Sequence, residues 1–318
     1  MPLVGKWKLE SQRKEYGKAL VELGKSRKDI VVLDADLSSS TQTAMFGQAF
    51  PERFFNCGIA EANMMDTAAG LAASGKTVFA STFAVFGTGR CYDQIRQSIA
   101  YPKLNVKIVV SHAGITVGGD GASHQTFEDI ALMRVLPNMI VIVPADTPET
   151  RKVIFKIADC KGPTYVRIGR ADLPTITRPE DEFEIGKANV IMEGDDLTLI
   201  GTGIMVSKCL LAAEELKKHK ISARVVNMST IKPVDEKLIV KCARETGAIV
   251  TAEEHSILEG LGSAVAMTLG ENASVPMRRV GIPDTFGESG DSEELMTKYG
   301  LTAENIVNAA HEVLSRKK

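Results

Sequence analysis

Short β-rich runs alternate with helical patterns along the whole chain of 318 residues, and this alternation constrains the fold more than any other feature. In the first half of the chain, apolar runs predict strands over Ile30–Leu33, Thr77–Ala80, Val106–Val110, Met139–Pro144 and Thr164–Ile168. Between them, the pattern predicts helices over Ala60–Ala73, Tyr92–Ile99 and Glu149–Asp159. Alternation at this spacing indicates βαβ units and a mainly parallel sheet.

A second α/β pattern follows a linker, which we predict over residues 173–190 because Leu173–Glu184 holds two prolines and a run of acids. Its predicted strands are Leu197–Gly201, Ala223–Met228, Ala248–Glu253 and Pro276–Ile282. Its predicted helices are Met205–His219, Glu236–Thr246, one that starts at Gly260, and Thr302–Ser315 with Thr302 as N-cap. The length also favours about two domains. We therefore predict an α/β chain with domains over residues 1–172 and 191–318.

The composition excludes several classes of protein. It is 44% hydrophobic and 25% charged, as in ordinary globular proteins, and the net charge of −2 argues against nucleic acid held by bulk electrostatics. No apolar run is long enough for a membrane span, and the first residues lack the apolar core of a secretory signal. Five scattered cysteines without a Cys-x-x-Cys pair predict free thiols in a reducing cytoplasm and no zinc site.

The segment Val110–Gln125 concentrates polar chemistry. It holds two of the chain's five histidines, an aspartate and four glycines within sixteen residues. Because it follows the predicted strand Val106–Val110, we expect it to form a site loop at the carboxyl end of that strand. His112, Asp120 and His124 in such a loop favour proton handling or hydrogen bonding to a hydroxyl-rich ligand.

Glu61 lies in a helix of small and apolar residues. A carboxylate desolvated there has a raised proton affinity, which suits a proton donor or acceptor near neutral pH. A glutamate in the first helical turn that is stabilised by the helix dipole is an equal alternative. Downstream, Phe83 and Phe86 are three residues apart and could form one apolar wall for a flat heterocycle, although core packing is the commoner role of this spacing. Arg90 could pair with Asp93 on the same helix.

Three further residues are candidates for anion binding. Ser40 lies in a polar turn after a predicted strand, where it could cap a helix or hold an anion at the helix N-terminus. Arg13 and Arg170 could bind phosphate through their guanidinium groups, or could be solvated surface charges. Glu253 and Glu254 are expected to be solvated turn charges rather than cation ligands.

Together these segments resemble the C-terminal half of transketolase over nearly the whole chain. The most specific pieces are Cys57–Met64, Phe83–Phe86 and His112–Gln125, while Glu253–His255, Gly260–Ala266 and Phe286–Gly290 resemble the family's C-terminal domain. The resemblance implies a thiamine-diphosphate-binding, pyrimidine-type domain with a parallel sheet, followed by a smaller α/β transketolase C-terminal domain.

The chain departs from a full transketolase, which begins with a diphosphate-binding domain carrying a Gly-Asp-Gly…Asn magnesium motif. Gly119-Asp120-Gly121 resembles the start of that motif, but Asn138 follows too early and Asn189 too late. Arg13 already resembles the start of the pyrimidine domain. The chain is therefore similar to the small subunit of a split transketolase. Thiamine diphosphate would be shared with a separate diphosphate-binding subunit, which would hold Mg²⁺ or Ca²⁺, in a two-plus-two heterotetramer with no metal site in this chain.

The resemblance implies a role for each matching residue. Glu61 would bond N1′ of the cofactor's aminopyrimidine and shuttle its proton, Phe83 and Phe86 would flank that ring, and Asp36 would lie near the thiazolium. His112, a second catalytic candidate, and Asp120 would contact sugar hydroxyls. The distal phosphate of the sugar would be held by four residues, Arg13, Ser40, His124 and Arg170.

The implied activity is transfer of a two-carbon ketol unit from a ketose phosphate to an aldose phosphate, as in the pentose phosphate pathway. Gly119 and Ala122-Ser123 replace the glutamate and Pro-Thr of many family members, which leaves the donor and acceptor sugars open. The alternatives are an enzyme similar to 1-deoxyxylulose-5-phosphate synthase, a transketolase for a sulfonated or branched sugar, or a non-catalytic partner. Retention of Glu61 together with His112, Asp120 and His124 argues against the last, because a scaffold needs none of them.

Overall fold

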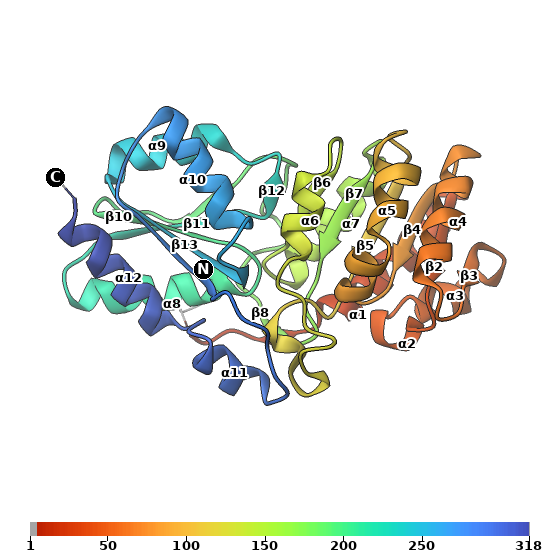
Figure 1. Cartoon of the computed structure of the whole chain (residues 1–318), viewed down its shortest axis with the longest axis horizontal. Coiled ribbons are helices and arrows are strands. Elements are labelled where there is room, and N and C mark those ends of the chain that lie inside the picture. Colours follow the sequence, from red (N-terminus) through yellow and green to blue (C-terminus); the bar gives the residue numbers. More distant parts are fainter. Residues whose placement is uncertain (1–4, 318) are drawn as a thin grey trace.

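A seven-stranded sheet forms the centre of the first half of the chain (Figure 1). The computed structural model describes residues 5–317, so residues 1–4 and 318 of the two predicted domains lie outside the described residues. Six neighbouring strands are parallel, and the edge strand β12 is antiparallel. The strand order is β12 (Thr230–Lys232), β6 (Ile140–Ile142), β7 (Thr164–Arg167), β5 (Val106–Val110), β4 (Thr77–Ser81), β2 (Ile30–Asp34) and β3 (Phe54–Asn56).

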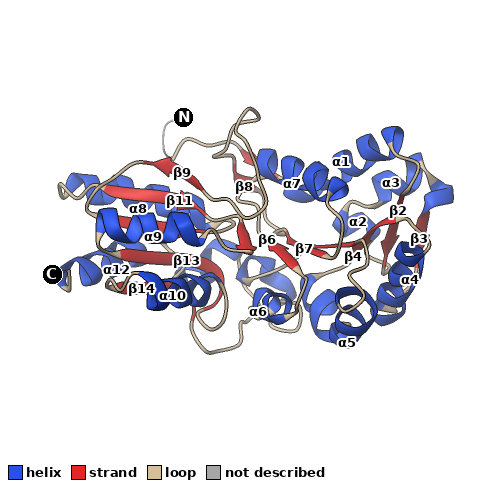
Figure 2. Cartoon of the chain, turned by 90° about the horizontal axis from the view of Figure 1, so that it is seen from above, coloured by secondary structure: helices blue, strands red, loops and turns tan. Residues whose placement is uncertain are grey.

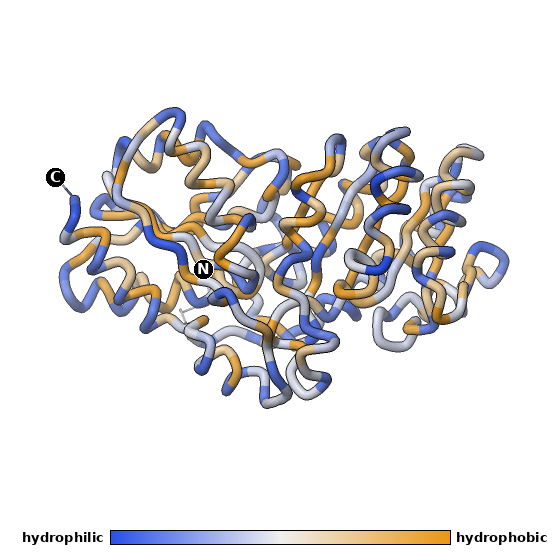
Figure 3. The backbone as a smooth tube through the Cα atoms, in the orientation of Figure 1, coloured by the Kyte–Doolittle hydropathy of each residue, from blue (hydrophilic) through white to orange (hydrophobic). Residues whose placement is uncertain are grey.

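Helices cover both faces of this sheet, as parallel strands require. Figure 2 shows α1, α3 and α7 on one face and α4, α5 and α6 on the other. All residues of β2, β4 and β5 are buried, which explains why these strands read as mainly apolar runs, with Lys107 inside β5 (Figure 3). The helices are α1 (Gln12–Ser26), α2 (Ser38–Thr41), α3 (Ala44–Ala49), α4 (Glu61–Ala73), α5 (Tyr92–Gln94), α6 (Asp129–Val135) and α7 (Thr147–Asp159).

The second half of the chain builds a five-stranded sheet between two helical layers (Figure 1). Its strand order is β14 (Met277–Ile282), β13 (Ile249–Ser256), β10 (Leu197–Gly201), β11 (Ala223–Asn227) and β9 (Asn189–Met192), of which only β9 is antiparallel. Helices α9 and α10 pack on one face, and α8 and α12 on the other. The helices are α8 (Met205–Lys218), α9 (Glu236–Thr246), α10 (Leu261–Asn272), α11 (Ser292–Lys298) and α12 (Ala303–Ser315).

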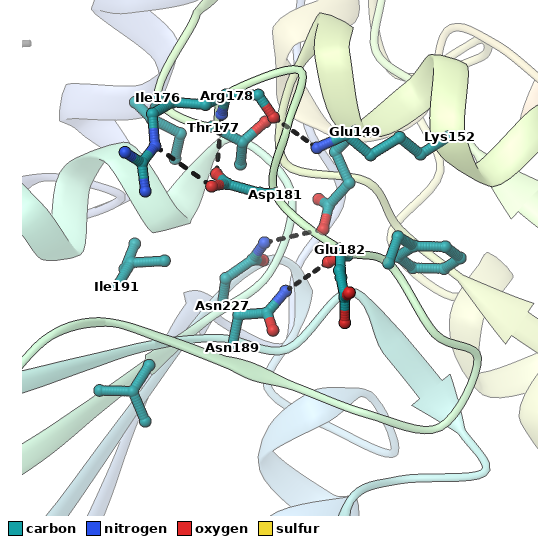
Figure 4. A pocket seen from close by; sticks show the side chains of 12 residues that line it. Glu149, Lys152, Ile176, Thr177, Arg178, Asp181, Glu182, Asn189, Ile191 and Asn227 are labelled. Carbon is teal, nitrogen blue, oxygen red and sulfur yellow. Dashed lines mark hydrogen bonds and ion pairs between the residues drawn. The ribbon is translucent and has the colours of Figure 1, made fainter. Parts of the chain in front are cut away.

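The two halves are joined by more than the chain connection. The segment predicted as a linker contains β8 (Leu173–Pro174), which pairs with β1 (Leu9–Glu10), and the start of β9. Strand β12, from the second half, pairs with β6 of the first sheet. A pocket of about 260 Å³ lies at this joint between α7, the linker and β11, and there the buried Glu149 accepts a hydrogen bond from Asn227 at 2.9 Å (Figure 4).

The structure confirms the α/β fold and most of the predicted elements. Thr302 caps α12 by accepting a hydrogen bond from the backbone N–H of Asn305 at 3.2 Å. The predicted helix Tyr92–Ile99 is wrong in type, because only its first three residues are α-helical and the π-helix η3 (Ile95–Ala100) follows them. Among residues 5–317, no helix is long and apolar enough to cross a membrane. All five cysteines are free thiols.

Candidate active site

Most of the predicted site residues follow the carboxyl ends of neighbouring parallel strands. Because these ends share one edge of the sheet, the residues converge there although they are distant in sequence. They come after β2 (Asp36 and Ser40), β3 (Glu61), β4 (Phe83 and Phe86), β5 (His112, Asp120 and His124) and β7 (Arg170). Arg13, from α1, reaches the same edge, where its Nη1 donates to the backbone oxygen of Ser40 at 2.8 Å.

Glu61 is the first residue of α4, and its side chain is 5% exposed. Its two carboxylate oxygens lie 3.1 and 3.3 Å from Nη1 of Arg90. The guanidinium of Arg90 also stacks over the Phe86 ring, 4.1 Å from the ring centroid. The predicted pairing of Arg90 with Asp93 is therefore wrong: the π-helix η2 (Phe86–Arg90) interrupts the α-helical spacing on which that prediction rested.

Phe83 and Phe86 form the predicted aromatic wall. Their rings are nearly parallel, at 14° with centroids 6.0 Å apart. Phe83 also stacks on the imidazole of His112 at 3.7 Å, and the His124 ring lies edge-on to Phe86 at 5.3 Å. The contacts therefore run without a break from Glu61 through Arg90 and the phenyl rings to both histidines.

His112 combines a strained backbone with a neutral side chain. Its φ of 57° lies in the left-handed region, which is uncommon outside glycine and concentrates at functional sites. The imidazole Nδ1 lies 2.8 Å from the Ser111 hydroxyl, which leaves Nε2 for a ligand. Burial, then the charges of Arg13, Arg170 and His124, lower the pKa of His112 to about 3. The ring is therefore uncharged at physiological pH, and its two nitrogens can donate one hydrogen bond and accept another.

This shift predicts how stability depends on pH. Between pH 6.5 and about 3, the unfolded chain binds a proton at His112 that the folded chain does not, so the free energy of unfolding falls as the pH falls through this window. At pH 5 the loss is about 2 kcal/mol relative to pH 8. The test is urea unfolding of His112→Asn, because asparagine tolerates the left-handed backbone. Between pH 8 and pH 5, the free energy of unfolding of this variant should fall by about 2 kcal/mol less than that of the wild type. An unchanged pH dependence would contradict a neutral His112.

Arg13 and Arg170 form a cationic pair. Arg13 Nη2 donates to the backbone oxygen of Arg170 at 3.0 Å, and Arg170 Nη1 donates to the backbone oxygen of Val117 at 3.1 Å. Burial and the charge of Arg170 lower the pKa of Arg13. Within residues 5–317, neither arginine pairs with a carboxylate, and the buried Arg13 Nε has no partner. Two guanidiniums near enough to influence each other's charge, with free donors, suit a dianion such as phosphate.

Asp36 and Asp120 belong neither to the series from Glu61 to the histidines nor to the arginine pair. Asp36, with a left-handed φ of 64°, exchanges hydrogen bonds with Asn56 at 3.1 and 3.2 Å. Asp120 is exposed and ends the 3₁₀ segment η4 (Ile115–Asp120). Both follow strands at this edge of the sheet, β2 and β5, but within residues 5–317 neither makes a hydrogen bond or ion pair with another predicted site residue.

The expectation that Glu253 and Glu254 are solvated is wrong. They are 1% and 5% exposed in β13, where their carboxylates accept backbone hydrogen bonds, and burial raises the pKa of both. In the part of the chain that the structure describes, no group of three His, Cys, Asp or Glu residues is placed to hold a metal ion.

Comparisons with known proteins agree with this geometry. The transketolase pyrimidine-binding domain model matches residues 11–175, and the transketolase C-terminal domain model matches residues 186–306. A Methanocaldococcus jannaschii protein described as a transketolase C-terminal section is 53% identical over 97% of this chain and 98% of its own length. A 6-deoxy-6-sulfo-D-fructose transketolase subunit of Clostridium sp. is 47% identical over 96% of this chain and 95% of its own length.

A solved structure of a split gene transketolase, described as an inactive β4 tetramer, superimposes with a TM-score of 0.92. It is 54% identical in sequence and covers 97% of this chain and 100% of its own. The two domain models account for both halves of the chain, and these relatives match it almost from end to end. The chain therefore belongs to the transketolase family and is a subunit of a transferase, carrying that family's pyrimidine-binding and C-terminal domains.

Proposed function

We propose that the chain is the C-terminal subunit of a thiamine-diphosphate-dependent transketolase that moves a two-carbon ketol unit from a ketose phosphate to an aldose phosphate. The observation that carries the proposal is the unbroken series of contacts at one sheet edge. It runs from the carboxylate of Glu61 to Arg90, and on through Phe86 and Phe83 to His112. It supplies, in one place, a proton-carrying group, an aromatic wall and a neutral hydrogen-bonding group.

The residues present fit the pyrimidine end of the cofactor. A buried carboxylate, joined through Arg90 to two near-parallel phenyl rings, suits a flat heterocycle with a basic ring nitrogen. When bound, thiamine diphosphate supplies the electron sink for cleaving a carbon–carbon bond of the ketose. Glu61 would hold a proton at N1′, Phe83 and Phe86 would orient the ring, and Asp36 would lie near the thiazolium.

The sugar would be held by the other residues of the same edge. His112, neutral and with Nε2 available, would act catalytically by exchanging hydrogen bonds with sugar hydroxyls, and Asp120 would contact a neighbouring hydroxyl. The distal phosphate would be bound by four residues, Arg13, Ser40, His124 and Arg170.

A second subunit completes this proposal. It would bind the diphosphate and hold Mg²⁺ or Ca²⁺, and two copies of each chain would form a heterotetramer in the cytoplasm, where free cysteines stay reduced. The match to a chain that forms an inactive β4 tetramer supports both self-association and a missing partner. Light scattering that gives a fully active one-to-one heterodimer would contradict the two-plus-two assembly.

A sulfonated sugar is the second candidate substrate. The relative named for 6-deoxy-6-sulfo-D-fructose is 47% identical, and guanidinium groups bind sulfonate as well as phosphate oxygens. Either sugar carries an anion at its distal end, so the Arg13–Arg170 pair would suit a phosphorylated and a sulfonated substrate.

This role of the pair can be tested with Arg170→Ala in the reconstituted enzyme. We expect the KM for a phosphorylated acceptor to rise about 10- to 150-fold, because one charge-assisted bond is lost, with little change for an unphosphorylated aldehyde. Arg178→Ala, which removes an exposed arginine that pairs with Asp181 in the linker, is the matched control and should change neither value. Equal losses on both acceptors would show that Arg170 is structural.

A further inference from the structure

The C-terminal domain holds the loop that carries the sugar-binding candidates. Both backbone groups of Thr116, in η4, bond to that domain. Its N–H donates to Glu254 Oε1 at 2.7 Å, and its carbonyl accepts from the Ser292 hydroxyl at 3.0 Å. Gly114 permits this approach, since a Cβ at its φ of 80° would lie 2.3 Å from the Glu254 carboxyl carbon.

The far end of the same loop is also fixed. Gln125 Nε2 donates to the backbone oxygen of Glu288 at 2.9 Å. A Cβ at Gly287 would lie 1.9 Å from Gln125 Oε1, so the two segments touch closely. The loop that presents Asp120 and His124 is therefore attached to the C-terminal domain at both ends.

Glu254 is also bound by residues of the first domain. Its backbone oxygen accepts from Arg167 Nη2 at 2.8 Å, and Arg167 Nε donates to Asp129 at 2.8 Å. Arg167 Nη1 also lies 3.9 Å from Glu254 Oε2, so the carboxylate is held between the buried Arg167 and the backbone N–H of Thr116.

We propose that Glu254 and Ser292 are positioning residues that set the geometry of the 114–125 loop, so that the C-terminal domain tunes recognition of the acceptor sugar without touching it. This inference rests on the proposed function in assigning the sugar to that loop. The contacts themselves do not depend on that assignment.

The neighbouring Glu253 is a matched control. It lies on the same strand and is also buried, but its carboxylate accepts from the backbone N–H groups of Leu261 and Gly262 at 2.7 and 2.8 Å. It therefore stabilises the N-terminus of α10 within its own domain. Glu253→Gln therefore weakens hydrogen bonds between a carboxylate and backbone N–H groups, as Glu254→Gln does, but leaves the bonds to the 114–125 loop intact.

The first test is amide hydrogen exchange in the full chain, without partner or sugar. Glu254→Gln and Ser292→Ala should each raise exchange over residues 114–121 about three- to tenfold, whereas Glu253→Gln should raise it only near α10. Ser292 is half-buried, so its variant keeps the test valid if Glu254→Gln does not fold. The proposal would be overturned if all three variants raised exchange in the loop equally, or if neither Glu254→Gln nor Ser292→Ala raised it.

The second test uses the reconstituted enzyme with its cofactor. Glu254→Gln and Ser292→Ala should raise the KM for the acceptor about three- to tenfold and leave exchange of the cofactor's C2 proton unchanged. The positioning role would be overturned if amide exchange in the loop rose while the KM stayed unchanged. It would also be overturned if the rate of C2 proton exchange fell by the same factor as the KM rose. If no ketol transfer occurs even with the unmodified chain, the proposed function fails while the exchange result on the loop still stands.

Discussion

Glu61→Gln is expected to leave folding and assembly intact while slowing exchange of the cofactor's C2 proton by about 10²- to 10⁴-fold, the range for loss of a positioned proton-transfer group. Glutamine is nearly isosteric with glutamate but cannot carry the proton. Because the Glu61 side chain is only 5% exposed, water cannot easily replace the carboxylate. Glu61→Ala should be no better and should retain the cofactor less well.

Arg90 provides the control for this prediction. Glu61→Gln also removes the ion pair with Arg90, so the effect of losing that pair has to be separated from the loss of proton transfer. Arg90→Gln breaks the pair and keeps the carboxylate, so it should retain most of the exchange rate. The measurement is hydrogen–deuterium exchange at C2 in the reconstituted complex, read by proton NMR after acid quench. A wild-type rate of C2 exchange in Glu61→Gln would show that Glu61 has no catalytic role.

The second large effect concerns the chain without its partner. We expect it not to bind thiamine diphosphate with Mg²⁺ tightly, because the described residues offer an aromatic wall but no group of three His, Cys, Asp or Glu that could hold the metal. Calorimetric titration of the chain alone, followed by titration after the diphosphate-binding subunit is added, gives the comparison. Micromolar binding by this chain alone would contradict the shared cofactor site.

Much of the fold could be predicted because buried parallel strands read as apolar runs. Strands β5 and β10 have the predicted bounds, and α4 begins one residue later than predicted. Edge strands carry a weaker signal: β3 has three residues and is partly exposed, and β12 joins the sheet of the other half, so neither was predicted.

The site was only partly predictable. The resemblance named its residues, and the sheet explains why they meet at one edge. The ion pair of Glu61 with Arg90 could not be predicted, since it depends on a π-helix and on residues 29 positions apart. The burial of Glu253 and Glu254 could not be predicted, because two adjacent acids usually face solvent. Here Glu254 accepts from Thr116 in the 114–125 loop, and Glu253 accepts from the N-terminus of α10.

The most direct measurement of the central claim is a two-chain transfer assay. The purified chain is mixed with the diphosphate-binding subunit, thiamine diphosphate and Mg²⁺, and transfer of a labelled two-carbon unit from xylulose 5-phosphate to ribose 5-phosphate is followed by mass spectrometry. We predict transfer by the mixture and none by either chain alone. A complex that forms and exchanges the C2 proton, yet transfers no ketol unit from any phosphorylated or sulfonated ketose, would contradict the account.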